Sequence, residues 1–210
     1  PYAMIGSGND SYDYKYGYIT DVAEQQKFAD AMRKYLLNRL GKAKPFSFLL
    51  VNDISYTNNY GGTSHMDYRL AMRGFVISCN NGAMYDDPEG FFSGMMANIV
   101  IDKFGRQASS VTDKFYEYSN GFYGDYLSKH DIDATIDNVE WQYGFMEKFD
   151  DIWGGDDCYF PYQERDLKDW VNAVLAMSRD EFVAKYGSSQ VMVNKYDTMK
   201  GIIEQMGFNI

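Results

Sequence analysis

The stretch DDPEGFFSGMMANIVIDKFG, residues 86–105, contains a helix start, an apolar helix body and a helix stop. Asp87 is a residue type that caps helix N-termini, and Pro88 suits the first helical position. Gly105 suits the position just after a helix ends. Apolar side chains occur nearly all round the helix predicted from Pro88 to Phe104. We therefore expect this helix to lie in the core.

Upstream of this helix, the sequence predicts one further helix and a small sheet. A helix is predicted from Thr20 or Asp21, either of which is a capping residue, to the glycine at Gly41. Apolar runs predict buried strands, and clusters of Gly, Asn and other polar residues predict loops. The predicted elements are an irregular segment over 1–19, strands over 46–51 and 74–79, a loop or hairpin region over 52–73, and a turn over 80–82.

Downstream, the chain is predicted to be mainly helical. Ser178 and Glu181 have the spacing of a capping box, and Gly187 and Gly207 are plausible helix stops. The predicted helices cover 111–119, 137–150, 163–176, 179–185 and 188–206. These patterns indicate one α+β domain spanning 1–210, which is helix-rich and has a small sheet in its N-terminal half.

The composition describes an acidic folded protein that is rich in aromatic residues. The net charge is −10, which disfavours nucleic acid and anionic membrane surfaces as partners. The chain has 19 Tyr and 14 Phe residues, and polar stretches such as 9–18 and 56–60 are rich in Tyr, Asn, Asp and Gly. Tyrosine suits wet binding surfaces because it joins an apolar ring to a hydroxyl group. No apolar run reaches the roughly 20 residues that cross a bilayer.

The two cysteines and two histidines do not form a recognisable site in the sequence. Cys79 and Cys158 either pair in one disulfide or are two small buried residues, and their spacing decides neither. His65 and His130 have no second histidine at helical spacing, so we interpret them as ordinary surface histidines.

Two acidic clusters invite a cation-binding interpretation. Asp131, Asp133 and Asp137 resemble the start of a calcium loop, but Ile136 and Gln142 occupy positions that the EF-hand reserves for Gly and Glu. Asp133 alternatively caps a following helix. The second cluster either binds a cation or is an acidic turn; it comprises Asp150, Asp151, Asp156 and Asp157 around Trp153.

Three acidic residues on a predicted helix are candidates for general acid–base chemistry. Glu164, Asp166 and Asp169 occupy overlapping faces of that helix. The alternative is that they complement the helix dipole, because acidic residues are common in first turns. The sequence contains no G-x-S-x-G elbow, P-loop or dinucleotide-binding glycine pattern.

The middle of the chain resembles a known family. Phe91 and Phe92 open a helix in the way that two aromatics do in the zinc-binding metallopeptidases found as surface lipoproteins of gut bacteria, where the helix carries H-E-x-x-H. In this chain Ala97 and Ile101 stand in place of the two histidines, and Asn98 stands in place of the glutamate. Residues four apart share one side of a helix, which is why that motif holds zinc.

The resemblance extends over about residues 20–210. The region around Asp169 resembles the family's downstream acidic helix, and residues 195–210 resemble its last helix and closing turn. Membership would imply a zincin-like fold, a lipoprotein leader that has been removed, and a periplasmic or cell-surface location. It would also imply that zinc is absent, because the ligand positions hold other residues.

Three functions follow as hypotheses. The first is a non-catalytic pseudo-metallopeptidase, a binding or accessory protein without a cofactor, whose partner is a peptide, a glycan or another protein. The second is an enzyme: a hydrolase with a carboxylate site at Glu164, Asp166 or Asp169, or a metallopeptidase-family enzyme with a non-standard metal site. The third is a structural or assembly domain, which would expose a large apolar patch or form an oligomer.

Overall fold

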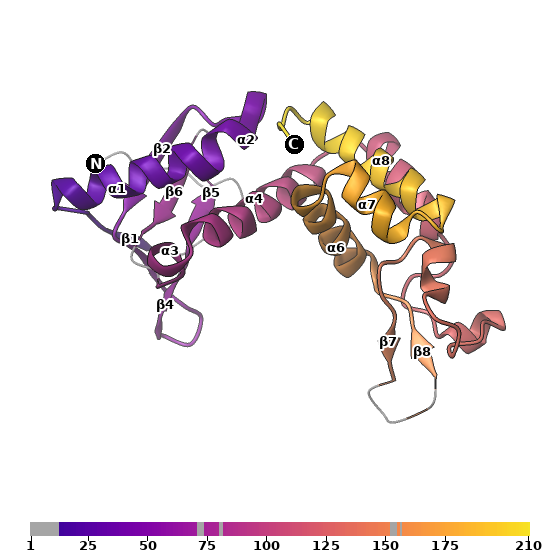
Figure 1. Ribbon diagram of the computed structural model, residues 1–210. Helices are drawn as coiled ribbons and strands as arrows, with labels where there is room; N and C mark the ends of the chain where they lie inside the picture. Colours follow the sequence, from indigo (N-terminus) through magenta and orange to yellow (C-terminus); the bar gives the residue numbers. More distant parts are fainter. Residues whose placement is uncertain (1–12, 71–73, 80–81, 152–154, 156) are drawn as a thin grey trace. The chain divides into compact units, whose positions relative to one another are not determined.

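The computed structural model describes residues 13–70, 74–79, 82–151, 155 and 157–210 (Figure 1). The chain divides into two compact units: unit 1 runs up to Met96 and includes Asn209, and unit 2 runs from Ala97 to Phe208 and includes Ile210. The predicted α+β, helix-rich class is confirmed, since the structure is about 54% helical with small sheets. That the whole chain forms a single domain stays a prediction, and each unit is described by itself.

Unit 1 begins with the predicted helix. The carboxylate of Asp21 accepts hydrogen bonds from the backbone N–H groups two and three residues later, at 2.7 and 3.1 Å, and so caps the N-terminus. The helical segment ends at Gly41, whose φ of 51° favours glycine. It comprises α1 (Val22–Met32), a π-helical turn η1 (Arg33–Leu37) and α2 (Asn38–Leu40), followed by a 3-10 turn η2 (Gly41–Ala43).

Two three-stranded sheets complete the N-terminal part. In the first, the order is β1 (Tyr14–Gly17), β3 (Asp53–Thr57) and β4 (Thr63–His65), all antiparallel. In the second, the order is β2 (Ser47–Val51), β6 (Gly74–Ser78) and β5 (Tyr68–Leu70), with β2 parallel and β5 antiparallel to β6. Side chains from β2, β3 and β6 form a buried cluster, which consists of Val51, Ile54 and Val76.

The sheet predictions are confirmed for 46–51 and 74–79, and the hairpin region over 52–73 contributes β3, β4 and β5. The irregular segment predicted over 1–19 is wrong at Tyr14–Gly17, which pairs with β3. The polar composition of this segment indicated a loop. It forms a strand because its backbone pairs with β3, a contact between distant residues that the local sequence does not reveal. Residues 1–12 and most of the turn predicted over 80–82 lie outside the described residues.

Helix α4 (Pro88–Phe104) has the predicted bounds and follows the short helix α3 (Gly82–Asp86). Its N-terminus is capped by Asp87, whose carboxylate accepts a hydrogen bond of 2.9 Å from the N–H of Gly90. The expectation of a core helix is confirmed, because its large apolar side chains are buried: Phe92, Met95, Met96, Ile99, Val100 and Phe104.

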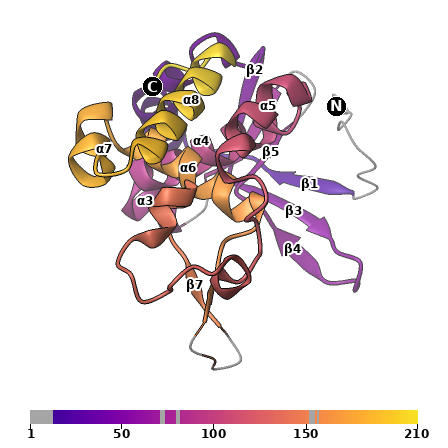
Figure 2. The same cartoon turned by 90° about the vertical axis from the view of Figure 1, so that its right-hand side faces the viewer.

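Among its described residues, unit 2 contains the second half of α4, four further α-helices and a small hairpin. Ser178 and Glu181 form the predicted capping box at the start of α7. The helices are α5 (Ser109–Tyr116), continued by a 3-10 turn η3 (Glu117–Ser119), then α6 (Gln163–Ala176), α7 (Arg179–Tyr186) and α8 (Gln190–Gln205), and they match the predictions to within a few residues. Figure 2 shows α6 and α8 packed together, with the hairpin extending from this helical part.

The helix predicted over 137–150 is wrong. A 3-10 turn η5 (Val139–Tyr143) occupies part of it, and Asn138 and Gly144 flank the turn with φ of 57° and 77°, values that a right-handed helix does not contain. The segment then enters strand β7 (Phe149–Asp150), which pairs with β8 (Cys158–Tyr159). Another 3-10 turn, η4 (Leu127–His130), lies before η5 in the chain. None of the described helices is both long and apolar enough to span a bilayer.

Candidate functional site

The three positions that the resemblance makes vestigial lie on α4 without forming a polar site. Ala97 is buried, Ile101 is half-buried and Asn98 is exposed. Ala97 and Ile101 offer no metal ligand, and among the described residues no group of three or more His, Cys, Asp and Glu side chains is arranged to hold a metal ion. The expected absence of zinc stays a prediction.

The three acidic candidates on α6 do not converge. Glu164 is exposed, Asp166 is buried and Asp169 is half-buried. Helical geometry explains the divergence, because residues four apart share a face. Asp166 and Trp170 face the interior of unit 2, whereas Arg165 and Asp169 face outward and contact each other. The helix therefore carries an inner and an outer polar group.

The inner group is a buried ion pair between Asp166 and Lys195 of α8. The Lys195 ammonium lies 2.8 Å from the Asp166 carboxylate, and it also donates to Ser119 Oγ at 2.8 Å and to the carbonyl of Gly144 at 2.9 Å. Tyr123 donates its hydroxyl to the same carboxylate oxygen at 2.9 Å. Four aromatic rings lie within 6 Å of the ammonium: Phe115, Tyr123, Phe145 and Trp170.

This inner group has the character of a structural anchor. Burial lowers the pKa of Lys195 to about 8 and raises the pKa of Asp166, although each group favours the charged form of the other. Lys195 stays protonated at neutral pH with all three donors used. Both side chains are sealed from solvent, with exposed fractions of 0% and 1%, so a substrate has no access to them. The pair ties α6 to α8 and to the loop at Gly144.

The outer group stands beside three neighbouring aromatic rings, which are tilted relative to one another. Phe149 of β7 is paired directly with Tyr159 of β8, and Tyr159 is also bridged to Tyr126 on its other side. Side chains of directly paired residues point to the same face of a sheet. The ring centroids are 6.0 Å apart for Tyr126 and Tyr159 and 5.5 Å apart for Tyr159 and Phe149. We call these three residues the aromatic row.

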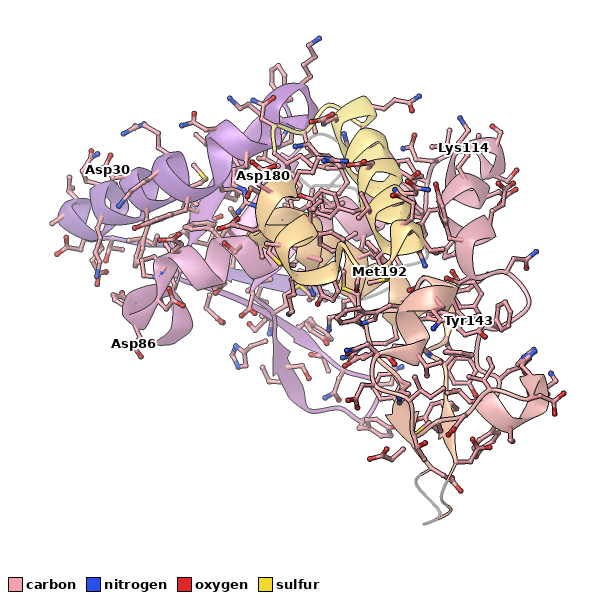
Figure 3. All side chains as sticks on the ribbon, turned by 45° about the vertical axis from the view of Figure 1, so that its right-hand side comes forward. Asp30, Asp86, Lys114, Tyr143, Asp180 and Met192 are labelled. Atoms are coloured by element: carbon pink, nitrogen blue, oxygen red, sulfur yellow. The ribbon has the colours of Figure 1, made fainter. Side chains whose placement is uncertain are left out.

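The opposite face of the same strands explains why the row faces outward. Cys158, which precedes Tyr159, belongs to the buried cluster of unit 2 together with Phe145 and Phe160. Because side chains alternate along a strand, Tyr159 points away from that cluster. Tyr143, which Figure 3 labels, lies in η5; it is partly buried and packs against the same cluster. The cluster thus supports the row from behind.

One end of the row is polar. The Arg165 guanidinium lies over the Phe149 ring, 5.4 Å from its centroid. It donates through Nε to Asp169 at 2.9 Å and through Nη2 to Glu147. Burial raises the pKa of Asp169 to about 6, against the lowering effect of Arg165, and the charge of Glu147 adds to the rise. Asp169 therefore changes protonation near neutral pH.

The other end of the row carries tyrosine hydroxyls. Tyr126 is 40% exposed and donates its hydroxyl to Asp151 at 3.2 Å. Tyr162 is 67% exposed, and its ring covers Gly124, where an added Cβ would lie only 2.4 Å from the ring. Gly124 also has a φ of 69°. A glycine at this position thus leaves room for the Tyr162 ring to pack against the backbone.

The remaining predicted candidates are engaged locally. His65 lies 2.8 Å from Asp53 in unit 1, and His130 lies 3.0 Å from Asp125 in unit 2. Asp133 does not cap a helix as one prediction had it. It accepts hydrogen bonds from the backbone N–H and hydroxyl of Thr135, and the residues that follow it directly, 134–138, form turns and not a helix.

The cysteines and the second acidic cluster also have clear placements. Cys79 and Cys158 are free, buried thiols, which agrees with the second of the two alternatives. Burial raises the pKa of Cys79 to about 12, so the thiol stays protonated at neutral pH. Asp157 accepts a hydrogen bond from Ser128, and Asp150 from the Cys158 thiol. Trp153 and Asp156 of that cluster lie outside the described residues.

Unit 2 also has an open hollow of about 510 Å³ on the face formed by α5, η3 and α8. Its lining joins Lys114 and Glu117, which have opposite charges, to the hydroxyls of Tyr118 and Thr198, which hydrogen-bond each other at 3.0 Å. Figure 3 labels Lys114, which projects outward from α5. None of the sequence-predicted site residues lines this hollow.

The aromatic row escaped the sequence patterns. Its members come from positions 126, 149 and 159, and β7 and β8 are two residues long, too short to display an alternating pattern. The one sequence signal was the high content of tyrosine and phenylalanine. Comparison of the chain with protein-family models, with curated proteins and with solved structures produced no match.

Proposed function

We propose that this chain is a non-catalytic binding protein and that the aromatic row of unit 2 holds an extended glycan. The single observation that carries the proposal is the register of three rings, Tyr126, Tyr159 and Phe149, on the outward face of one small sheet. A non-catalytic binding protein was the first of the three hypotheses drawn from the sequence. The row gives it a specific surface.

The chemistry of the row suits sugar rings better than folded protein surfaces. A pyranose presents apolar C–H faces to an aromatic ring and hydroxyl groups to polar neighbours, and recognition sites combine apolar area with a few placed polar groups. Here Tyr159 offers ring area at the centre. Arg165 with Asp169 at one end and the Tyr126 hydroxyl with Asp151 at the other offer donors and acceptors for hydroxyl groups.

A binding experiment with matched variants tests this proposal. Native affinity electrophoresis would measure retardation of the protein by neutral, amine-bearing and acidic soluble polysaccharides. We expect at least one of them to retard the wild-type protein and Tyr159→Ala to abolish the retardation. Tyr60→Ala is the control, because Tyr60 is a 98% exposed tyrosine that belongs to unit 1 and is not a member of the row. Unretarded migration of the wild type in every gel contradicts the proposal.

The same proposal includes a zincin-like fold for the chain. The two aromatics that open α4 and the substitutions Ala97, Asn98 and Ile101 support a zincin-like pseudo-metallopeptidase at the periplasm or cell surface of a bacterium. We expect purified protein to contain no stoichiometric zinc when it is analysed by mass spectrometry of the metals. One zinc per chain would contradict this part and would favour a metallopeptidase-family enzyme with a non-standard site.

One observation favours a second candidate, a hydrolase with a carboxylate site. Asp169 has a raised pKa beside the carboxylate of Glu147, and general acids need a carboxyl group that holds its proton near neutral pH. Arg165 bonds to both carboxylates, which favours a fixed structural group instead. Release of reducing ends from any polysaccharide in the panel, abolished by Asp169→Asn, would establish this candidate over the first.

A further inference from the structure

Arg69 of β5 is a buried cation in unit 1, with an exposed fraction of 8%. An arginine side chain keeps its positive charge, and a buried charge is costly unless it is paired. The ion pairs of the described residues nevertheless do not include Arg69. The guanidinium therefore lacks, in the described part of the chain, the counter-ion that its burial calls for.

The contacts of Arg69 hold its guanidinium in place and leave one edge unused. Nη1 donates to the Tyr16 hydroxyl at 3.2 Å, and the guanidinium carbon lies 4.0 Å from the centroid of the Tyr14 ring. Nε is sealed from solvent and has no hydrogen-bond acceptor among the described residues. Nη2 is not sealed, and it also donates to no described residue. Nε and Nη2 together form the edge of the fork that matches the two oxygens of a carboxylate.

The strand register sets Arg69 apart from the other cationic side chains of these strands. Arg69 is paired directly with Val76 of the buried cluster, so both side chains point to the same face of the sheet. The two tyrosines pack against this cluster as well. Lys15, which lies between them in β1, points to the opposite face, and the pairing of β1, β3 and β4 puts His65 on that face too. The described strands therefore offer one positive charge beside the two tyrosines.

From these contacts we propose that Arg69, together with the Tyr14 ring and the Tyr16 hydroxyl, binds the carboxylate group of an acidic ligand. The ligand enters at Nη2, which solvent reaches, and its second oxygen accepts from Nε. A single cation in a chain of net charge −10 suits a singly charged carboxylate better than a phosphate group, which carries more than one negative charge. The site belongs to unit 1 and does not depend on the glycan-binding row of unit 2.

Nuclear magnetic resonance can observe the Nε–H group itself. In proton–nitrogen correlation spectra of the labelled chain, the Arg69 signal is assigned by its disappearance in Arg69→Lys. The signal is followed during titration with glucuronate, a sugar acid, and with N-acetyltyrosine, which ends in a carboxylate as a peptide does. Their amides, glucuronamide and N-acetyltyrosinamide, lack the negative charge and serve as matched probes. We expect at least one acid to shift the signal saturably and its amide to leave it unchanged, and the acid that binds more tightly identifies the ligand as sugar or peptide.

Three variants test the role of each group by calorimetric titration of the acid that binds. Arg69→Lys keeps the charge but lacks the fork, and it should weaken binding at least about tenfold. Tyr16→Phe removes the hydroxyl that orients the guanidinium and should weaken binding to a smaller extent. Arg33→Lys is the control, because Arg33 lies on the exposed surface of unit 1 and pairs with Asp30; it should bind as the wild type does.

Several results would overturn the inference. An unshifted Nε–H signal with both acids would do so, and so would amides that shift it as much as the acids. Arg69→Lys with unchanged affinity would show that the fork takes no part. An equal or larger response to inorganic phosphate would contradict the preference for a carboxylate. If Arg69→Lys does not fold, the wild-type titration and Tyr16→Phe still decide the question. The polysaccharide gels test the aromatic row independently of all these results.

Discussion

At the scale of single residues, helix α6 separates two kinds of polar chemistry. Asp166 is sealed inside unit 2 with Lys195, whereas Asp169, three residues later, reaches the surface beside Arg165 and the aromatic row. The sequence grouped Glu164, Asp166 and Asp169 as possible partners because all three are acidic and close in the chain. Their burial separates them, and each therefore leads to a different prediction.

Loss of Lys195 should strongly destabilise unit 2. Lys195→Met leaves the Asp166 carboxylate buried without its counter-ion, which costs about 3–5 kcal/mol. The double change Lys195→Met with Asp166→Leu removes both charges and should recover most of that loss. Urea denaturation followed by tryptophan fluorescence measures both free energies of unfolding. A single variant as stable as the wild type would show that the pair does not anchor the unit.

Asp169 should make stability depend on pH in a particular direction. Its pKa of about 6 in the folded protein exceeds the ordinary value of 3.8, so the folded state binds the proton more tightly. The free energy of unfolding contributed by this group therefore falls as pH rises from about 4 through 6. Asp169→Asn removes the effect and should gain about 1–2 kcal/mol relative to the wild type between pH 4.5 and 7. An unchanged difference across that range would contradict the assignment.

At the scale of elements, the β7–β8 hairpin and the segment at Tyr126 determine the binding surface. Strand pairing aligns the three rings, and the buried cluster around Phe145 and Phe160 holds the strands from the opposite face. Gly124, two residues before Tyr126, leaves room for the exposed Tyr162 ring.

The role of Gly124 can be tested against Gly121, which serves as a control. Gly121 and Gly124 both have positive φ, at 87° and 69°, but only Gly124 lies under a ring. Alanine at either position should cost about 1–2 kcal/mol for the left-handed backbone. Gly124→Ala should in addition displace Tyr162 and weaken glycan binding, while Gly121→Ala should not. Equal retardation of the two variants in the polysaccharide gels would mean that Tyr162 takes no part in binding.

At the scale of the whole molecule, the sequence anticipated the elements better than the site. Helices with clear caps, such as the one from Pro88 to Phe104 and the one after Ser178, were predicted nearly residue by residue because capping is a local interaction. The segment over 137–150 was misassigned because left-handed residues at Asn138 and Gly144 and a cross-strand partner at Tyr159 override its helical pattern.

The candidate site depends almost entirely on contacts between distant parts of the chain. Tyr126, Phe149 and Tyr159 come together only through strand pairing, and Asp166 meets a lysine 29 residues away. Helical spacing could propose Asp169 as a polar surface residue, but it could not place Arg165 against an aromatic ring. Composition alone indicated a surface rich in aromatics, without saying where it lies.

The most direct test of glycan binding by the aromatic row is native affinity electrophoresis of the wild-type protein and of Tyr159→Ala in the panel of soluble polysaccharides. We predict that at least one polysaccharide retards the wild-type protein and that Tyr159→Ala loses this retardation, because Tyr159 is the central ring of the row. Equal retardation of both proteins, or unretarded migration of the wild type with every polysaccharide, would contradict this function.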